Sequence, residues 1–180
     1  SHSGTTPEVV AAAEFLQSKP VTTIGVTQKT DSPLAQKVHH VLPYGETKAG
    51  YYASFMTKLA LVSGFLSVVE PGWKHHDKVI ASLKNLPGAL VDAALKNEAR
   101  ATDDARIYKD DRVMYVVGAG PMFSTAYVSG VCVLMEMQWM HVHPLVAAEF
   151  FHGPFEVVDH TTPLIVLVGE DPSRTEAERV

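Results

Sequence analysis

Apolar and polar residues alternate along the first part of the chain in blocks that predict helices and strands in turn. Residues 7–16 form an apolar-rich helical segment, and the β-branched run at residues 21–27 predicts a buried strand. Residues 33–37 predict a short helix, and residues 40–44 a second short strand. This succession of helices and strands is typical of an α/β fold.

A long helix is predicted to open at residues 45–48 and to end at the Pro-Gly pair at residues 71–72. A second helical pattern begins near residue 79, is broken by Pro87 and Gly88, and resumes at residues 90–95. Apolar side chains of the long helix recur at helical spacing, which marks them as core or subunit-interface residues. They are Tyr52, Phe55, Met56, Leu59, Val62, Leu66 and Val69.

The charged stretch at residues 102–112 is the best internal boundary, and the same logic begins again after it. Residues 113–120 predict a buried strand that ends in glycines, and residues 122–137 predict a helix. Further strands are predicted at residues 142–146 and 164–169. Strand, glycine turn and helix form the unit of an open parallel sheet, which binds ligands at the carboxyl ends of its strands.

These patterns predict an α/β protein made of two three-layer αβα units with parallel sheets, related by an imperfect repeat. We expect the first unit at residues 1–104 and the second at residues 105–180. The sequence opens on a polar segment with no preceding element and ends in residues that resemble the first turns of a helix. We therefore expect the first unit to lack its N-terminal part and the second to lack its C-terminal part.

Composition narrows the class of protein. A chain of 180 residues with 46% hydrophobic content can bury a real core. The net charge of −5 and the scattered basic residues argue against a nucleic-acid partner. No apolar run approaches the ~20 residues of a membrane helix, so we expect no membrane partner. The single cysteine, Cys132, excludes an internal disulfide and fits a reducing compartment, so we expect a cytoplasmic protein.

The opening segment S-H-S-G-T-T is the first candidate site. It places four hydroxyl residues around one glycine, directly before Pro7. Thr6 is a typical helix N-cap, and Pro7 is favoured as the first helical residue. Hydroxyls and free backbone N–H groups at a helix N-terminus can bind an anion. The alternative is a plain helix cap, and these residues alone leave both interpretations open.

Glu136 and His152, sixteen positions apart, are the second candidate site. A carboxylate and an imidazole make an acid/base pair if the fold brings them together. Because its neighbours are apolar, Glu136 lies either at the polar margin of its helix or partly desolvated with a raised pKa. The raised pKa would suit removal of a carbon-bound proton near neutral pH. The alternative is a purely structural carboxylate at a helix end.

Nine histidines raise the question of a metal site. His141 and His143 would lie on one face of a strand. Glu149 and His152 have a spacing that could bind zinc from a helix. The sequence nevertheless contains no H-E-x-x-H motif and no cysteine cluster. We therefore predict no metal site and no cofactor.

Several segments together carry a resemblance to a known family. S-H-S-G-T-T-P-E, followed by a buried strand, resembles the phosphate loop of the sugar isomerase (SIS) domain family. M-E-M-Q-W-M-H together with E-F-F-H-G-P-F-E resembles the deglycases that act on phosphorylated fructosamines such as 6-phosphofructose-aspartate and fructoselysine 6-phosphate. D-S-P-L-A, Y-K-D-D-R-V and D-P-S-R-T-E-A-E-R extend the resemblance to nearly all 180 residues.

The resemblance, carried over position by position, implies catalytic roles for Glu136 and His152. The positions that it implies for the phosphate-binding hydroxyls are Ser1, Ser3, Thr5 and Thr6. Secondary candidates for contacts with the substrate are His2, Thr47 and Lys48. No metal ligand is implied.

The resemblance also implies an activity and an assembly. The activity is conversion of a 6-phosphorylated fructosamine to glucose 6-phosphate and a free amino acid by Glu/His acid–base catalysis. The assembly is a homodimer with shared active sites, because in relatives the catalytic histidine often comes from the neighbouring subunit.

Two other functions stay open: aldose–ketose isomerisation of a sugar phosphate or aminosugar phosphate, and sugar-phosphate sensing without catalysis. The isomerase domain of glucosamine-6-phosphate synthase has a lysine three residues before its glutamate. This sequence has Val133 there, which disfavours the aminosugar synthase.

Overall fold

The computed structural model describes residues 1–180 and divides into two compact units, Ser1–Leu95 and Lys96–Val180. Each unit has its own parallel sheet, so the predicted α/β class is confirmed. The division lies inside helix α3 (His76–Tyr108). The boundary predicted after residue 104 falls in the same helix and stays a prediction.

The first unit is built on two parallel strands, β1 (Ile24–Thr27) and β2 (His40–Pro43). Thr27 pairs with Pro43 in the ladder, so both strands end at the same edge of the sheet. Helix α1 (Pro7–Gln17) precedes β1, and the short 3₁₀ helix η1 (Ala35–Lys37) connects the two strands. Helix α1 packs against η1. This arrangement places the start of α1 and the ends of both strands in one unit.

Helix α2 (Gly50–Val69) begins later than predicted, because residues 45–48 precede it in an irregular segment. Helix α3 then runs through Pro87 without interruption, so the predicted break at residues 87–88 is wrong. Pro87 and Leu90 line one apolar cavity of about 450 Å³ with Tyr52 and Met56 of α2. The helix thus continues through the proline, which removes one backbone hydrogen bond, at a position that faces an apolar cavity shared with α2. The charged segment predicted as a boundary is also helical as far as Tyr108.

A hydrogen bond between the side chains of His76 and Ser63 links helix α3 to helix α2. His76 Nδ1 lies 2.6 Å from the hydroxyl of Ser63, whose residue is only 4% exposed. His76 is the first residue of α3 and only partly exposed, so this ring is part of the contact between the two helices and not a solvated turn residue. A buried hydroxyl needs a partner, and the imidazole supplies it.

Helix α2 is also long and apolar enough to cross a membrane. It has 20 residues, most of them apolar, and only a small part of it is buried. The expectation that no apolar run approaches membrane length is therefore wrong. One such helix is weak support for a membrane span, because helices from the interiors of soluble proteins meet the same criteria.

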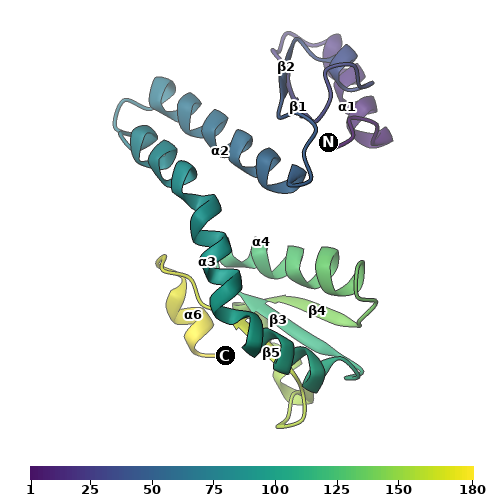
Figure 1. Cartoon of the computed structure of the whole chain (residues 1–180), viewed down its shortest axis with the longest axis vertical. Helices are drawn as coiled ribbons and strands as arrows, with labels where there is room; N and C mark the ends of the chain where they lie inside the picture. Colours follow the sequence, from purple (N-terminus) through teal and green to yellow (C-terminus); the bar gives the residue numbers. More distant parts are fainter. The chain divides into compact units, whose positions relative to one another are not determined.

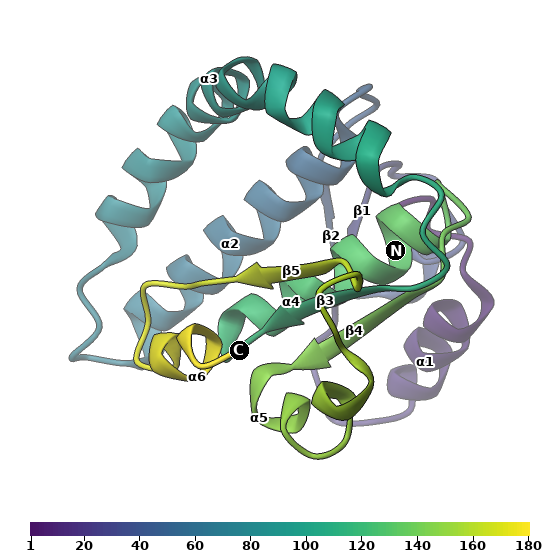
Figure 2. The ribbon, with the colours of Figure 1, turned by 90° about the horizontal axis from the view of Figure 1, so that it is seen from below.

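The second unit contains a three-stranded parallel sheet in the order β4–β3–β5 (Figure 2). The central strand β3 (Met114–Gly118) is buried along its whole length. Strands β4 (Val142–Val146) and β5 (Leu164–Leu167) pair with it on either side. All three strands lie where the apolar runs of the sequence predict them.

The helices of the second unit are mostly short. The first, α4 (Pro121–Tyr127), continues directly as the π-helix η2 (Val128–Met135). Helix α5 (Ala147–Phe150) and the 3₁₀ turn η3 (Pro154–Val157) follow β4. Helix α6 (Arg174–Glu178) follows β5. The predicted helix at residues 122–137 is thus confirmed in place, but half of it is wider than an α-helix.

Two core clusters cover the two faces of this sheet, because alternate side chains of β3 point to opposite sides. On one face, Met114 and Val116 pack with Ala126 of α4, which lies along the sheet in Figure 1. On the other face, Val117 packs with Phe150 of α5. Helices on both faces of a parallel sheet make this unit three-layered, as predicted.

Candidate functional site

The hydroxyl groups of residues 1–6 are gathered in a tight loop before α1. The Ser1 and Thr6 hydroxyl oxygens lie 2.8 Å apart, and the Gly4 N–H donates to Ser1 Oγ over 3.1 Å. Ser3 Oγ and Thr5 Oγ1 lie 2.7 Å apart. The four predicted phosphate-binding residues therefore form two hydroxyl pairs around one glycine.

The alternative of a plain helix cap is not what the structure shows. Thr6 occupies the N-cap position of α1, but its side chain makes no capping hydrogen bond. Its hydroxyl is paired with Ser1 instead. The hydroxyls of this loop thus bond to one another and to loop N–H groups, and none caps the helix; the 11-residue helix adds the positive end of its dipole.

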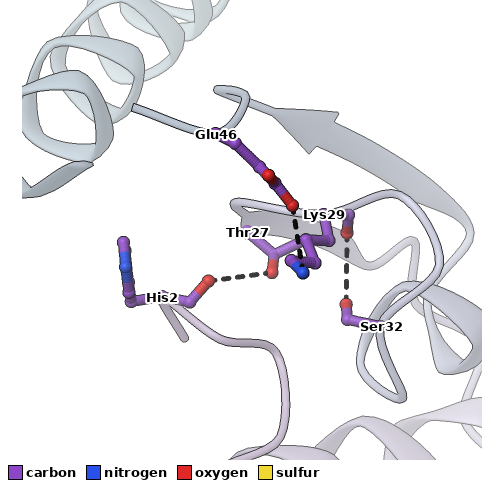
Figure 3. Close-up of polar contacts among 5 residues, drawn as sticks. All are labelled: His2, Thr27, Lys29, Ser32 and Glu46. Carbon is purple, nitrogen blue, oxygen red and sulfur yellow. Dashed lines mark hydrogen bonds and ion pairs between the residues drawn. The ribbon is translucent and has the colours of Figure 1, made fainter. Parts of the chain in front are cut away.

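Backbone contacts fix the loop against the carboxyl end of β1. The His2 carbonyl accepts hydrogen bonds from the Gln28 N–H at 3.0 Å and from Thr27 Oγ1 at 3.3 Å, the second drawn in Figure 3. The Leu34 N–H donates to the Gly4 carbonyl over 2.9 Å. Thr27 is fully buried, so this attachment is shielded from solvent.

Gly4 is buried and has φ +69°, a conformation that only glycine adopts without strain. A Cβ at this position would lie 2.8 Å from Thr27 Oγ1 and even closer to the Ser32 side chain. The loop therefore needs glycine both for its turn and for its close approach to β1.

The His2 ring lies between two tyrosines. It stacks on Tyr44 at a centroid distance of 5.9 Å and on Tyr51 at 5.4 Å. Its Nδ1 shares a hydrogen bond of 2.7 Å with the Tyr44 hydroxyl. A Cβ on Gly50 would lie 2.5 Å from His2 Cε1, so the first residue of α2 leaves room for the ring. The two tyrosines could not be predicted as partners of His2, because they follow it by more than forty residues in the chain.

Thr47 and Lys48 lie in the exposed segment before α2 and not at a helix start. Thr47 Oγ1 accepts a hydrogen bond of 3.1 Å from the Ala49 N–H. Glu46, the residue before Thr47, forms an ion pair with Lys29 from the segment after β1: Lys29 Nζ lies 3.0 Å from Glu46 Oε1. The hydrogen bond and the charge of Glu46 raise the pKa of Lys29, and Asp31 adds to the effect.

Glu136 follows the π-helix η2 directly. Its N–H donates to the Val131 carbonyl over 3.0 Å, five residues back, which is the bond that defines a π-helix. The Glu136 residue is exposed. Of the two environments expected for it, the structure gives the polar margin of the helix. π-Helical segments often occur at functional sites, and this one was not predicted from the sequence.

Trp139, three residues after Glu136, is a second unusual feature. Its φ is +57°, and it is 89% exposed. Positive φ is rare for a bulky residue and costs conformational energy. Its N–H donates to the Met135 carbonyl over 3.1 Å, which closes the end of the helix.

His152 lies in the turn after α5, where its N–H donates to the Glu149 carbonyl over 3.0 Å. Its residue is exposed, and Gly153, with φ +126°, follows it. No hydrogen bond or ion pair joins Glu136 to His152. Both residues belong to the second unit, whereas the hydroxyl loop belongs to the first. The roles of all these residues stay predictions.

The histidines considered as metal ligands have other surroundings. His143 stacks on Tyr115 at 5.5 Å, and His141 is exposed just before β4. No three His, Cys, Asp or Glu side chains lie close enough together to share a metal ion. Cys132 is half-buried in η2 and forms no disulfide.

The chain is similar in sequence to known deglycases of about twice its length. No family model matches the chain. It is 39% identical to fructosamine deglycase FrlB of Bacillus subtilis strain 168 over 182 residues, which covers 99% of this chain and 55% of that protein. It is 28% identical to fructoselysine 6-phosphate deglycase of Escherichia coli K12 over 98% of this chain and 51% of that protein. The chain thus spans about half the length of these relatives.

A solved structure from Bacillus subtilis, named provisionally as a phosphosugar isomerase, has the same fold. It superposes with a TM-score of 0.91 at 35% sequence identity and covers 99% of this chain and 55% of that one. The chain therefore spans about half the length of this solved structure as well. The resemblance to the sugar isomerase family, and within it to the fructosamine deglycases, is confirmed over nearly the whole of this chain.

Proposed function

We propose that this chain is the part of a sugar-phosphate deglycase that binds and cleaves a 6-phosphorylated fructosamine, giving glucose 6-phosphate and a free amino acid. The names of its relatives support a sugar-phosphate deglycase or isomerase. The observation that carries the proposal is the loop at residues 1–6. Its hydroxyls converge at a helix N-terminus and at the carboxyl end of β1, where α/β sheets bind ligands.

The loop would hold the phosphate of the substrate. In each of the pairs Ser1–Thr6 and Ser3–Thr5 one O–H donates to the other oxygen, which leaves two O–H donors for phosphate oxygens, and all four if the pairs open around the ligand. Hydrogen bonds to a charged acceptor are stronger than neutral ones. Binding energy from this remote group can orient the reacting carbons at the other end of the sugar.

The chemistry needs one base, one acid and one water. His152 would help to open the sugar ring by taking the proton of the anomeric hydroxyl and giving a proton to the ring oxygen as the bond between that oxygen and the anomeric carbon breaks. The Glu136 carboxylate would take a proton from C1 of the ketosamine while an acid protonates the C2 oxygen, which gives an enolamine. Return of the first proton to C2 and loss of the N–H proton then give the aldose imine, with the former ketone oxygen now a hydroxyl. One water then adds to the C1=N bond, and the C–N bond breaks to release the amino acid and glucose 6-phosphate.

The meeting of Glu136 and His152 over one sugar is part of the proposal, and so is a homodimer in which one of them comes from the partner subunit. Helix α2 exposes several large apolar side chains that would suit a subunit interface, among them Tyr51, Phe65 and Val68. A cytoplasmic location also belongs to the proposal. It is supported by the lone Cys132, which fits a reducing compartment.

Isomerisation of a sugar phosphate is the second candidate function, favoured by the name of the Bacillus subtilis structure. Product analysis separates the two. The protein is incubated with a panel of fructosamine 6-phosphates and with fructose 6-phosphate, and glucose 6-phosphate and free amino acid are measured. Equal release of both from a fructosamine supports the deglycase. Interconversion of plain sugar phosphates alone supports the isomerase, and tight binding without conversion supports a sensor.

The catalytic pair has its own test. We expect Glu136→Gln and His152→Asn each to lower kcat by about 10²–10⁴ while phosphate binding is largely kept. Undiminished turnover in either variant removes that residue from the mechanism. If the sites are shared between subunits, mixing the two inactive variants restores part of the activity. Mixing without recovery argues against shared sites.

A further inference from the structure

A cleft of about 680 Å³ lies at the carboxyl edge of the β1–β2 sheet. Residues 28–31 after β1 form one wall, and residues 43–46 at and after the end of β2 form the other. Ligands of parallel α/β sheets bind outside the carboxyl ends of the strands. None of these eight residues belongs to the phosphate-binding or catalytic set described above, so the cleft has no assigned role.

The cleft adjoins the hydroxyl loop. Gln28, which lines the cleft, donates its N–H to the His2 carbonyl over 3.0 Å. Tyr44, which also lines it, shares a hydrogen bond of 2.7 Å with His2 Nδ1. A ligand whose phosphate is held by the loop therefore has this cleft as a neighbouring space within the same unit.

One cation and two carboxylates line the cleft. Lys29 Nζ lies 3.0 Å from Glu46 Oε1, and the two side chains come from opposite walls (Figure 3). The Lys29 carbonyl accepts a hydrogen bond of 3.2 Å from Ser32 Oγ, which fixes the backbone beneath the lysine. Both charged side chains are more than half exposed, so their pairing adds little to stability and can open for a ligand.

The charges decide between classes of ligand. Lys29 stands against Glu46 and Asp31, so the cleft carries a net charge of −1, which disfavours a second phosphate dianion. A group with one negative and one positive charge next to each other matches it better, because it can pair with both sides at once. An α-amino acid attached through its nitrogen is such a group, since its carboxylate is two bonds from the amine.

We propose that Lys29 and Glu46 form the subsite for the amino-acid part of the substrate, with Lys29 binding the carboxylate and Glu46 the amine nitrogen. The identity of the ligand rests on the proposed deglycase function, but the test does not depend on turnover. The pair selects for amino acids over simple amines. When the ligand amine binds Glu46, the Lys29 ammonium loses its partner, and only a ligand with a carboxylate replaces it.

The test compares two ligands that differ only in the carboxylate: the glycine adduct of fructose 6-phosphate and the corresponding glycinamide adduct. Dissociation constants are measured by calorimetry with the intact protein carrying Glu136→Gln, which prevents turnover. We expect the glycine adduct to bind about ten- to hundredfold more tightly, as for a hydrogen bond to a charged group. Lys29→Met removes this preference, and glucose 6-phosphate binds as before.

Lys37→Met is the matched control. Lys37 Nζ lies 2.9 Å from Glu14 Oε1, in a comparably exposed ion pair that does not line the cleft. This variant keeps the preference for the glycine adduct. Glu46→Gln weakens both adducts by a similar factor but not glucose 6-phosphate, because it affects the amine contact that both share.

Three outcomes overturn the proposal: no preference in the parent protein, a preference that survives Lys29→Met, or equal loss of glucose 6-phosphate binding in Lys29→Met. The last would place Lys29 in the phosphate site. The result is also separable from the deglycase assignment. A preference that depends on Lys29 in a protein that cleaves no fructosamine keeps the subsite and discards the activity, and active enzyme without the preference does the reverse.

Discussion

Replacement of Gly4 by alanine tests whether the loop has the conformation seen here. Gly4 has φ +69°, and an added Cβ would meet the Ser32 side chain and lie 2.8 Å from Thr27 Oγ1. The left-handed conformation costs a non-glycine residue about 1–2 kcal/mol. Overpacking in a closed site adds about 1–3 kcal/mol. The free energy of unfolding of the protein should therefore fall by roughly 2–5 kcal/mol, a large part of typical stability.

Gly45→Ala separates the two contributions. Gly45 has φ +78°, but nothing lies within 4 Å of an added Cβ. This variant has the conformational cost alone, so the difference between the two variants measures the clash and should be about 1–3 kcal/mol. Urea unfolding monitored by circular dichroism gives both free energies, and the slope with denaturant should stay the same.

A second readout connects the loop to its proposed ligand. Saturating glucose 6-phosphate should stabilise the wild-type protein by about 2.7 kcal/mol at a hundred times its Kd. Gly4→Ala should lose most of this stabilisation at the same concentration, because the loop cannot close on β1. If Gly4→Ala is no more destabilising than Gly45→Ala, the packing of the loop described here is wrong. If it is destabilised but responds normally to the ligand, the loop does not hold the phosphate.

Three further predictions concern stability. Hydrogen bonds from the Ser173 side chain and backbone lower the pKa of Asp171, so the folded state binds this proton less readily than the unfolded state does. Stability from this group is therefore present above the ordinary pKa of 3.8 and is lost as the pH falls below that value. Urea titrations from pH 3 to 6 measure the free energy of unfolding across this range, and Asp171→Asn should make its acid dependence flatter. An unchanged profile would contradict this prediction. Ser63→Ala removes the hydrogen bond to His76 and should cost about 1 kcal/mol in urea unfolding, whereas no change would mean that water replaces it. Pro87→Ala should raise the thermal midpoint because it restores a helix donor, and a lower midpoint would show that packing of the ring against α2 matters more.

The sheet of the second unit could be predicted because its pattern is unambiguous. Strand β3 is a run of apolar residues that the structure buries on both faces, and glycines end it. Local sequence failed where distant packing decides. Pro87 would end an isolated helix, but apolar side chains before and after it line one cavity with α2. The partner of His76 is also set by the fold, because Ser63 on α2, thirteen residues earlier in the chain, lies 2.6 Å from its ring nitrogen.

The candidate site shows the same division. The hydroxyl loop is one contiguous segment, so its residue types and glycine mark it as a candidate anion site, beside the alternative of a helix cap. The Lys29–Glu46 pair forms because strands β1 and β2 end at the same edge of the sheet, and this pairing could not be predicted from the residues alone. The stacking of His2 between Tyr44 and Tyr51 depends on the same arrangement and on the start of α2. The π-helix before Glu136 is a matter of backbone hydrogen bonding five residues apart, for which no residue pattern was available.

The most direct measurement of the central claim compares one fructosamine with and without its 6-phosphate as substrate for the intact protein. Release of the free amino acid is followed for both compounds, and kcat/KM is determined for each. If the hydroxyl loop holds the phosphate, two charge-assisted hydrogen bonds alone predict a preference of about a hundredfold or more for the phosphorylated compound. Equal kcat/KM for the two compounds, or no release of amino acid from either, would contradict the account.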